Sequence, residues 1–225
     1  MKDLGVLKYV LGIEVTRRSL GTFICQRKYA LDIITESGLL GSKPAPFPIT
    51  QNHKLALADG ALLDDPERYQ RLVGCLIYLT ITRSELSYCI HVLAQFMQCP
   101  RVDHWDAALR VVRYLKGRPD QRIFLHFDSD LQLYAYCDSD WVNCPLTRRS
   151  LTGYFVILGH SPISWKTKKQ HTVSRSSAEA EYQSMATTSC ELKWLKDDKF
   201  GAATTGLPVV VYDHEMKELQ QLIAE

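Results

Sequence analysis

Leu131-Gln-Leu-Tyr-Ala-Tyr-Cys137 is typical of a β-strand, and it is followed directly by Asp138-Ser-Asp-Trp141. About forty residues later, Ser176-Ser-Ala-Glu-Ala-Glu-Tyr182 has the composition of a helix start, and Val209-Val-Val-Tyr-Asp213 then ends a second predicted strand on an aspartate. Carboxylates are the hard oxygen ligands that Mg²⁺ prefers. Paired ions in such sites contact the attacking and leaving oxygens of a phosphodiester. The stretch therefore predicts a metal site of the nuclease type.

The aspartates also have ordinary structural explanations. Asp138 and Asp140 could form an Asx turn at a strand end, where aspartate is common. Asp213 could be the N-cap of a following helix, a role compatible with metal binding. Asp138 alone is weak evidence, and the prediction depends on the three carboxylates occurring together.

The helix start offers two glutamates with different expected roles. Ser176 and Glu179 fit a capping box, in which Glu179 accepts a hydrogen bond from the Ser176 N–H. Glu181 lies two residues on, about 200° around the helix, so the two carboxylates face different ways. Glu181 is therefore the better metal candidate, and its alternative role is a solvent-facing helix acid.

Basic residues cluster around the same stretch, in the loop after the first strand and in the run before the helix. Phosphate backbones attract such clusters, whereas the alternative is a solvated loop. The candidate nucleic-acid-binding residues are Arg148, Arg149, Lys166, Lys168, Lys169 and Arg175.

The composition limits the class of protein without deciding its function. The 225 residues, 46% of them hydrophobic, fit one large or two small domains. A net charge of +2 neither requires nor excludes a nucleic-acid partner, because a local basic patch is sufficient. The seven cysteines include no Cys-x-x-Cys pair, which favours reduced thiols. Without a signal peptide or membrane span, we expect an intracellular protein, in the cytoplasm, nucleus or an organelle, with no membrane partner.

The hydrophobic pattern changes near residues 117–128, where we place a domain boundary. Before it, the pattern predicts a hairpin over 7–16 and 22–26, helices over 27–37, 66–81, 84–97 and 102–116, and a strand over 122–127. After it, the pattern predicts strands over 131–137, 152–158 and 163–167, a helix over 177–196, a strand over 208–212 and a short helix over 216–223. The second half therefore has an α/β pattern with a mixed sheet. We expect its first and last strands to pair in parallel, since one long crossover joins them.

Several motifs resemble landmarks of the C-terminal part of the Pol polyprotein of copia-type LTR retrotransposons. They are Met1-Lys-Asp-Leu-Gly-Val-Leu-Lys-Tyr-Val-Leu-Gly-Ile-Glu14, Tyr69-Gln-Arg-Leu-Val-Gly-Cys-Leu-Ile-Tyr-Leu79, Arg113-Tyr-Leu-Lys-Gly117, Tyr136-Cys-Asp-Ser-Asp-Trp141, Thr147-Arg-Arg-Ser-Leu-Thr-Gly-Tyr154 and Ser174-Arg-Ser-Ser-Ala-Glu-Ala-Glu-Tyr182. The resemblance covers nearly the whole chain.

The resemblance implies an α+β and α/β protein. Residues 1–127 would form a helical thumb- and connection-like region at the end of a reverse transcriptase. Residues 128–225 would form an incomplete ribonuclease H-like mixed sheet with flanking helices, truncated at its C-terminus. Asp138, Glu181 and Asp213 match the family's catalytic, metal-binding carboxylates. The implied reaction is hydrolysis of RNA in an RNA–DNA hybrid with two Mg²⁺ or Mn²⁺ ions, the hybrid being held by shape and 2′-OH contacts.

The sequence also departs from the family pattern. It has no Tyr-x-Asp-Asp motif, so no polymerase activity is expected. It stops soon after Asp213, before the family's last strand and helix, so we expect weakened cleavage. A catalytically dead remnant that still binds nucleic acid is therefore the second hypothesis. Another aspartate-dependent metal enzyme ranks third, because the chain has no Gly-rich phosphate loop. The oligomeric state is left open.

Overall fold

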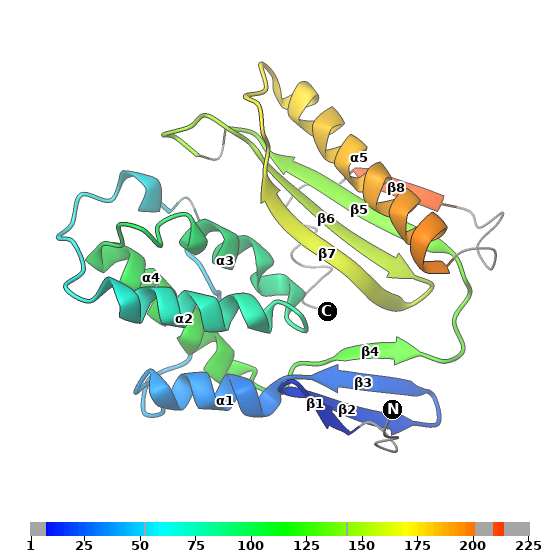
Figure 1. Cartoon of the computed structure of the whole chain (residues 1–225), viewed down its shortest axis with the longest axis horizontal. Helices are drawn as coiled ribbons and strands as arrows, with labels where there is room; N and C mark the ends of the chain where they lie inside the picture. The colour runs from blue at the N-terminus through cyan, green and yellow to red at the C-terminus, as the bar shows by residue number, and fades with distance from the viewer. Residues whose placement is uncertain (1–7, 52, 143, 201–208, 214–225) are drawn as a thin grey trace. The chain divides into compact units, whose positions relative to one another are not determined.

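The computed structural model describes residues 8–51, 53–142, 144–200 and 209–213, the last three residues of the third range and all of the fourth by their main chain only. The chain divides into two compact units, Met1–Leu125 and His126–Glu225. Both are mixtures of helices and strands (Figure 1). No helix among the described residues has the length and apolarity needed to cross a membrane. The assignment of each unit to a domain of Pol stays a prediction.

The first unit contains a four-stranded sheet with strand order β1-β2-β3-β4. The strands are β1 (Tyr9–Val10), β2 (Ile13–Arg18), β3 (Gly21–Cys25) and β4 (Ile123–His126). The predicted hairpin is confirmed as the antiparallel pair β2 and β3. The sequence pattern did not reveal that β4 joins this hairpin. Phe124 stacks on Phe23 of β3 with ring centroids 4.4 Å apart.

Among the described residues of this unit, four α-helices follow β3: α1 (Arg27–Glu36), α2 (Pro66–Leu79), α3 (Ser87–Ala94) and α4 (Val102–Gly117). The predicted start of α2 is confirmed, because the Asp65 carboxylate accepts a hydrogen bond from the Arg68 N–H at 3.0 Å. The helix predicted over 84–97 is shorter, with a 3₁₀ turn at Ser84–Leu86 before α3. The helices bury Leu76, Leu93 and Leu115 completely.

The second unit is built on a mixed sheet with strand order β7-β6-β5-β8. It consists of β5 (Leu133–Asp140), β6 (Leu151–Leu158), β7 (Ser161–Lys169), α5 (Ser177–Trp194), a π-helical turn (Leu195–Phe200) and β8 (Val209–Asp213). β5 and β8 pair in parallel, which confirms the prediction. β5, β6 and β7 form an antiparallel meander. The helix predicted over 216–223 lies outside the described residues.

Helix α5 covers one face of this sheet (Figure 1). Alternate residues of β5, namely Leu133, Ala135 and Cys137, are fully buried and form a core with Leu192 and Leu195 from the helical segment. The alternation is that of a strand with one face packed against a helix. This packing fixes α5 against β5 and sets the position of the residues at the end of that strand.

Candidate functional site

Asp138 lies inside β5, not after its end. The strand continues to Asp140, because Asp138 pairs with Gly153 and Asp140 with Leu151 of β6. The Asp138 side chain is buried, with 5% of the residue exposed. Its Oδ1 accepts a hydrogen bond from the Ser139 N–H at 2.6 Å.

Asp213 is the last residue of β8, the parallel neighbour of β5. Its main chain lies opposite Cys137, one residue from Asp138. The two aspartates therefore belong to adjacent parallel strands at the same end of the sheet, where α/β proteins commonly bind ligands. The side chain of Asp213 lies outside the described residues.

The first turn of α5 separates the roles of its two glutamates. Ser176 is the N-cap, and its Oγ accepts a hydrogen bond from the Glu179 N–H at 3.2 Å. The Glu179 carboxylate accepts from the Arg175 N–H at 2.7 Å, one residue before the predicted donor Ser176. Glu179 is exposed and serves the helix terminus as expected, although through a different amide.

Glu181 is half-buried on the next part of the same turn. Ser184, three residues later on the same side of α5, is fully buried. Its Oγ donates a hydrogen bond to the main-chain carbonyl of Asp138 at 2.8 Å. This bond attaches the helix that carries Glu181 to the strand that carries Asp138. Sequence reasoning missed Ser184, since a serine within a helix carries no signal except its spacing from Glu181.

The metal site predicted from Asp138, Glu181 and Asp213 stays a prediction. Among the side chains that the structure describes, no group of three His, Cys, Asp or Glu residues could hold a metal ion. The predicted set includes Asp213, whose side chain is not among them. In chemical type, Asp138 and Glu181 fit Mg²⁺ or Mn²⁺, because both supply hard oxygen donors.

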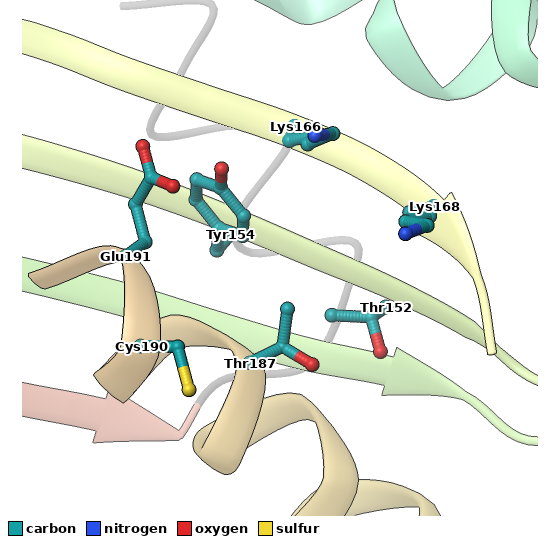
Figure 2. Close-up of a pocket in the computed structure, with 7 residues that line it drawn as sticks. All are labelled: Thr152, Tyr154, Lys166, Lys168, Thr187, Cys190 and Glu191. Atoms are coloured by element: carbon teal, nitrogen blue, oxygen red, sulfur yellow. The ribbon is translucent and has the colours of Figure 1, made fainter. Parts of the chain in front are cut away.

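A groove beside α5 contains two of the predicted basic residues. Its volume is about 230 Å³, and Figure 2 shows the lining residues, which are Thr152, Tyr154, Lys166, Lys168, Thr187, Cys190 and Glu191. Lys166 and Lys168 alternate along β7 and are exposed. Glu191 accepts a hydrogen bond from Ser164 Oγ at 2.8 Å. Burial, together with the nearby Glu191 charge, raises the pKa of Tyr154 to about 12. Tyr154 is therefore neutral at physiological pH, and the lysines give this groove a cationic side.

The loop between β5 and β6 approaches the end of β7. Burial raises the pKa of the Cys144 thiol, but hydrogen bonds with Thr147 and Lys169 outweigh burial and bring the pKa to about 7. Lys169 therefore contacts this loop, while Arg148 and Arg149 within it are exposed. The basic residues of two chain segments thus gather at the end of the sheet where Asp138 lies. Arg175, also exposed, immediately precedes the N-cap of α5.

Comparison with known proteins identifies the family. The chain is 45% identical over 216 residues to the retrovirus-related Pol polyprotein from transposon RE2 of Arabidopsis thaliana, and 42% identical over 216 residues to that from transposon RE1. These alignments cover 95% of this chain and 15% of each polyprotein. An uncharacterised mitochondrial protein of the same plant is 42% identical over 196 residues, which cover 86% of this chain and 80% of that protein. No family model and no solved structure matches. The chain belongs to the family of copia-type, retrovirus-related Pol polyproteins from transposons.

Proposed function

We propose that the unit His126–Glu225 is a ribonuclease H-like domain that hydrolyses the RNA strand of RNA–DNA hybrids with divalent metal. One observation carries this proposal: the buried Asp138 is joined through its carbonyl to the helix of Glu181. Asp213 ends the neighbouring parallel strand. Membership of the Pol family also supports a ribonuclease H-like function. The unit Met1–Leu125 would serve as the thumb- and connection-like part that grips nucleic acid.

Asp138, Glu181 and Asp213 are the residues that would hold the metal. A carboxylate as buried as Asp138 is costly to keep charged unless a cation or hydrogen bonds compensate it. A divalent ion held by these residues would supply Lewis-acid activation of water and would neutralise charge on the phosphodiester. The protein's own contribution is orientation. The Ser139 N–H holds the Asp138 carboxylate, and the Ser184 hydroxyl holds the helix of Glu181.

The hybrid would be bound through its phosphates. Lys166 and Lys168 border the groove beside α5, and Arg148, Arg149 and Arg175 are exposed at the same end of the unit. Such contacts orient a nucleic acid without reading its sequence. Lys169, which hydrogen-bonds Cys144, would contribute mainly by holding the loop of the two arginines.

The test is cleavage of a labelled RNA–DNA hybrid by the purified chain in Mg²⁺ or Mn²⁺. We expect metal-dependent cleavage that Asp138→Asn and Glu181→Gln each reduce by at least about a hundredfold, since misplacing a reacting group costs large factors. Glu179→Gln is the matched control. It should keep most of the activity, because the glutamine oxygen can still accept from the Arg175 N–H.

Two outcomes would contradict this assignment. Cleavage that persists in a chelator would exclude the metal mechanism. Equal losses of cleavage from Glu179→Gln and Glu181→Gln would mean that activity depends on the integrity of the helix terminus and not on metal binding by the Glu181 carboxylate. Binding of the hybrid without any cleavage would instead support the catalytically dead nucleic-acid-binding remnant.

A further inference from the structure

A buried amide at the end of β7 connects the segments that carry the proposed metal ligands. Gln170 follows the last residue of β7 and is 6% exposed. Its Nε2 donates hydrogen bonds to Thr152 Oγ1 at 3.1 Å and to the Ala180 carbonyl at 2.9 Å. Its Oε1 accepts from Ser174 Oγ at 3.0 Å. Because both N–H groups and the oxygen are used, the orientation of the amide is fixed.

The partners of Gln170 are neighbours of the proposed ligands. Ala180 immediately precedes Glu181 in α5. Thr152 lies opposite Ser139, the residue after Asp138, in the β5–β6 pair. One side chain therefore spans the distance between the first turn of α5 and the strand beside Asp138.

The hydrogen bonds of Gln170 hold α5 at a second point, in addition to the bond between Ser184 and the Asp138 carbonyl. Ala180 and Ser184 are both fully buried and lie one helical turn apart, with Glu181 between them. Attachment at two points one turn apart fixes both the position of this turn along the sheet and its rotation. A single attachment would leave the turn able to pivot.

The loop that leads into α5 is held by the same network. Ser174, 3% exposed, accepts a hydrogen bond from Gln183 Nε2 at 3.3 Å. Its carbonyl accepts from the indole N–H of Trp141 at 3.2 Å, and Trp141 directly follows β5. The loop is therefore tied to α5 and to the chain just after Asp140.

We propose that Gln170 is a positioning residue that sets the separation of the Asp138 and Glu181 carboxylates and thereby the affinity for divalent metal. This inference rests on the proposed function. Groups that orient metal ligands typically change metal affinity by about ten- to a hundredfold when they are removed. A residue that only stabilises the fold would change the melting temperature and leave metal affinity intact.

The experiment compares the Mn²⁺ dissociation constants of the full chain and of Gln170→Met, measured by titration calorimetry. Methionine has a similar length but makes none of the amide's hydrogen bonds. We expect the dissociation constant to rise at least about tenfold. In the metal-free protein, amide hydrogen exchange should quicken in the first two turns of α5.

Val156→Ala, which removes fully buried core volume under α5 and lies outside the network, is the control. It should lower the melting temperature and leave Mn²⁺ affinity within about twofold.

The outcomes separate this inference from the proposed function. Equal Mn²⁺ affinity in wild type and Gln170→Met would overturn the positioning role and leave the carboxylate site standing. Equal weakening by Val156→Ala would show that lost stability alone explains the effect. A wild-type chain that binds no Mn²⁺ would overturn the carboxylate site, and the inference with it. Should Gln170→Met fail to fold, Ser174→Ala takes its place. It removes the bond that Gln170 accepts and the bond that Ser174 accepts from Gln183, but it keeps both bonds that Gln170 donates, so it should raise the dissociation constant by a smaller factor.

Discussion

At the residue scale, His104 is a buried ionisable group that links two segments of the first unit. Its Nδ1 accepts a hydrogen bond from the Arg101 N–H at 2.9 Å, so the ring proton sits on Nε2, 2.9 Å from the Leu55 carbonyl that accepts it. The ring also stacks on Phe96 with centroids 4.0 Å apart. Burial lowers the pKa of His104, although the bond to Leu55 opposes this effect. The folded protein therefore favours the neutral imidazole.

This pKa shift predicts acid sensitivity of the first unit. The folded-state pKa is below the ordinary value of 6.5, so the stabilisation is complete above that value and is lost as pH falls through it. Protonation would also remove the acceptor for the Arg101 N–H. Between pH 7.5 and 5.5 we expect wild type to lose more unfolding free energy than His104→Gln, which has no group that titrates in this range. Urea unfolding, monitored by hydrogen exchange of amides within residues 8–125, measures this difference. Parallel pH profiles for the two proteins would contradict it.

The acidic residues show what sequence spacing can and cannot predict. The Ser-x-x-Glu spacing identified the capping role of Glu179, because capping is a local interaction. The amide that it contacts was predicted wrongly, since the choice between Ser176 and Arg175 depends on the backbone of the entering loop. Asp138 was predicted to end its strand, because the strand-like pattern stops at Cys137. Pairing with Gly153 and Leu151 of β6 extends the strand to Asp140, and this tertiary pairing is not visible in the local pattern.

At the element scale, the local pattern predicted most helices and strands of both units. It also predicted the parallel pairing of β5 and β8, because a long crossover requires it. The pairing of β4 with the N-terminal hairpin was missed, since nothing in residues 123–126 specifies a partner so distant in sequence. Likewise, Gln170 was overlooked because its importance comes from contacts with three separate segments. Residues that act through tertiary contacts have no local signature.

The turn between β6 and β7 offers a test of element geometry. Gly159 has φ +56°, and a Cβ there would approach the Asp130 carbonyl oxygen to 2.5 Å. We expect Gly159→Ala to lower the unfolding free energy by more than about 1 kcal/mol, because the backbone strain adds to the clash. Gly74→Ala is the matched control. Gly74 lies within α2, where an added Cβ would meet nothing within 4 Å, so alanine should stabilise by up to about 1 kcal/mol. Chemical denaturation of both variants measures the effects, and a shift of the same sign in both would contradict the turn geometry.

At the scale of the whole molecule, a net charge of +2 conceals an uneven distribution. Basic residues from the β5–β6 loop, from β7 and from the segment before α5 gather at the end of the second unit that holds Asp138. Folding creates this concentration of charge, because it brings Arg148 and Arg149 to the same end of the sheet as the lysines of β7. A local patch of this kind attracts phosphates even when the whole chain is nearly neutral.

The patch predicts how hybrid binding depends on salt. Each lysine that neutralises a phosphate releases a counterion, so its removal should lower the slope of log affinity against log salt by about 1. We expect Lys168→Gln, in the groove beside α5, to weaken binding by a similar factor for hybrids of different sequence and to reduce the slope by about 1.

The matched control is Lys193→Gln, an exposed lysine in the last turn of α5 that does not line the groove. Its slope should equal that of wild type. Fluorescence anisotropy across a salt series, with Ca²⁺ in place of Mg²⁺ to suppress cleavage, measures both. Identical slopes for the two variants would mean that the hybrid does not contact this groove, while a loss confined to one hybrid sequence would mean that Lys168 reads bases and not phosphates.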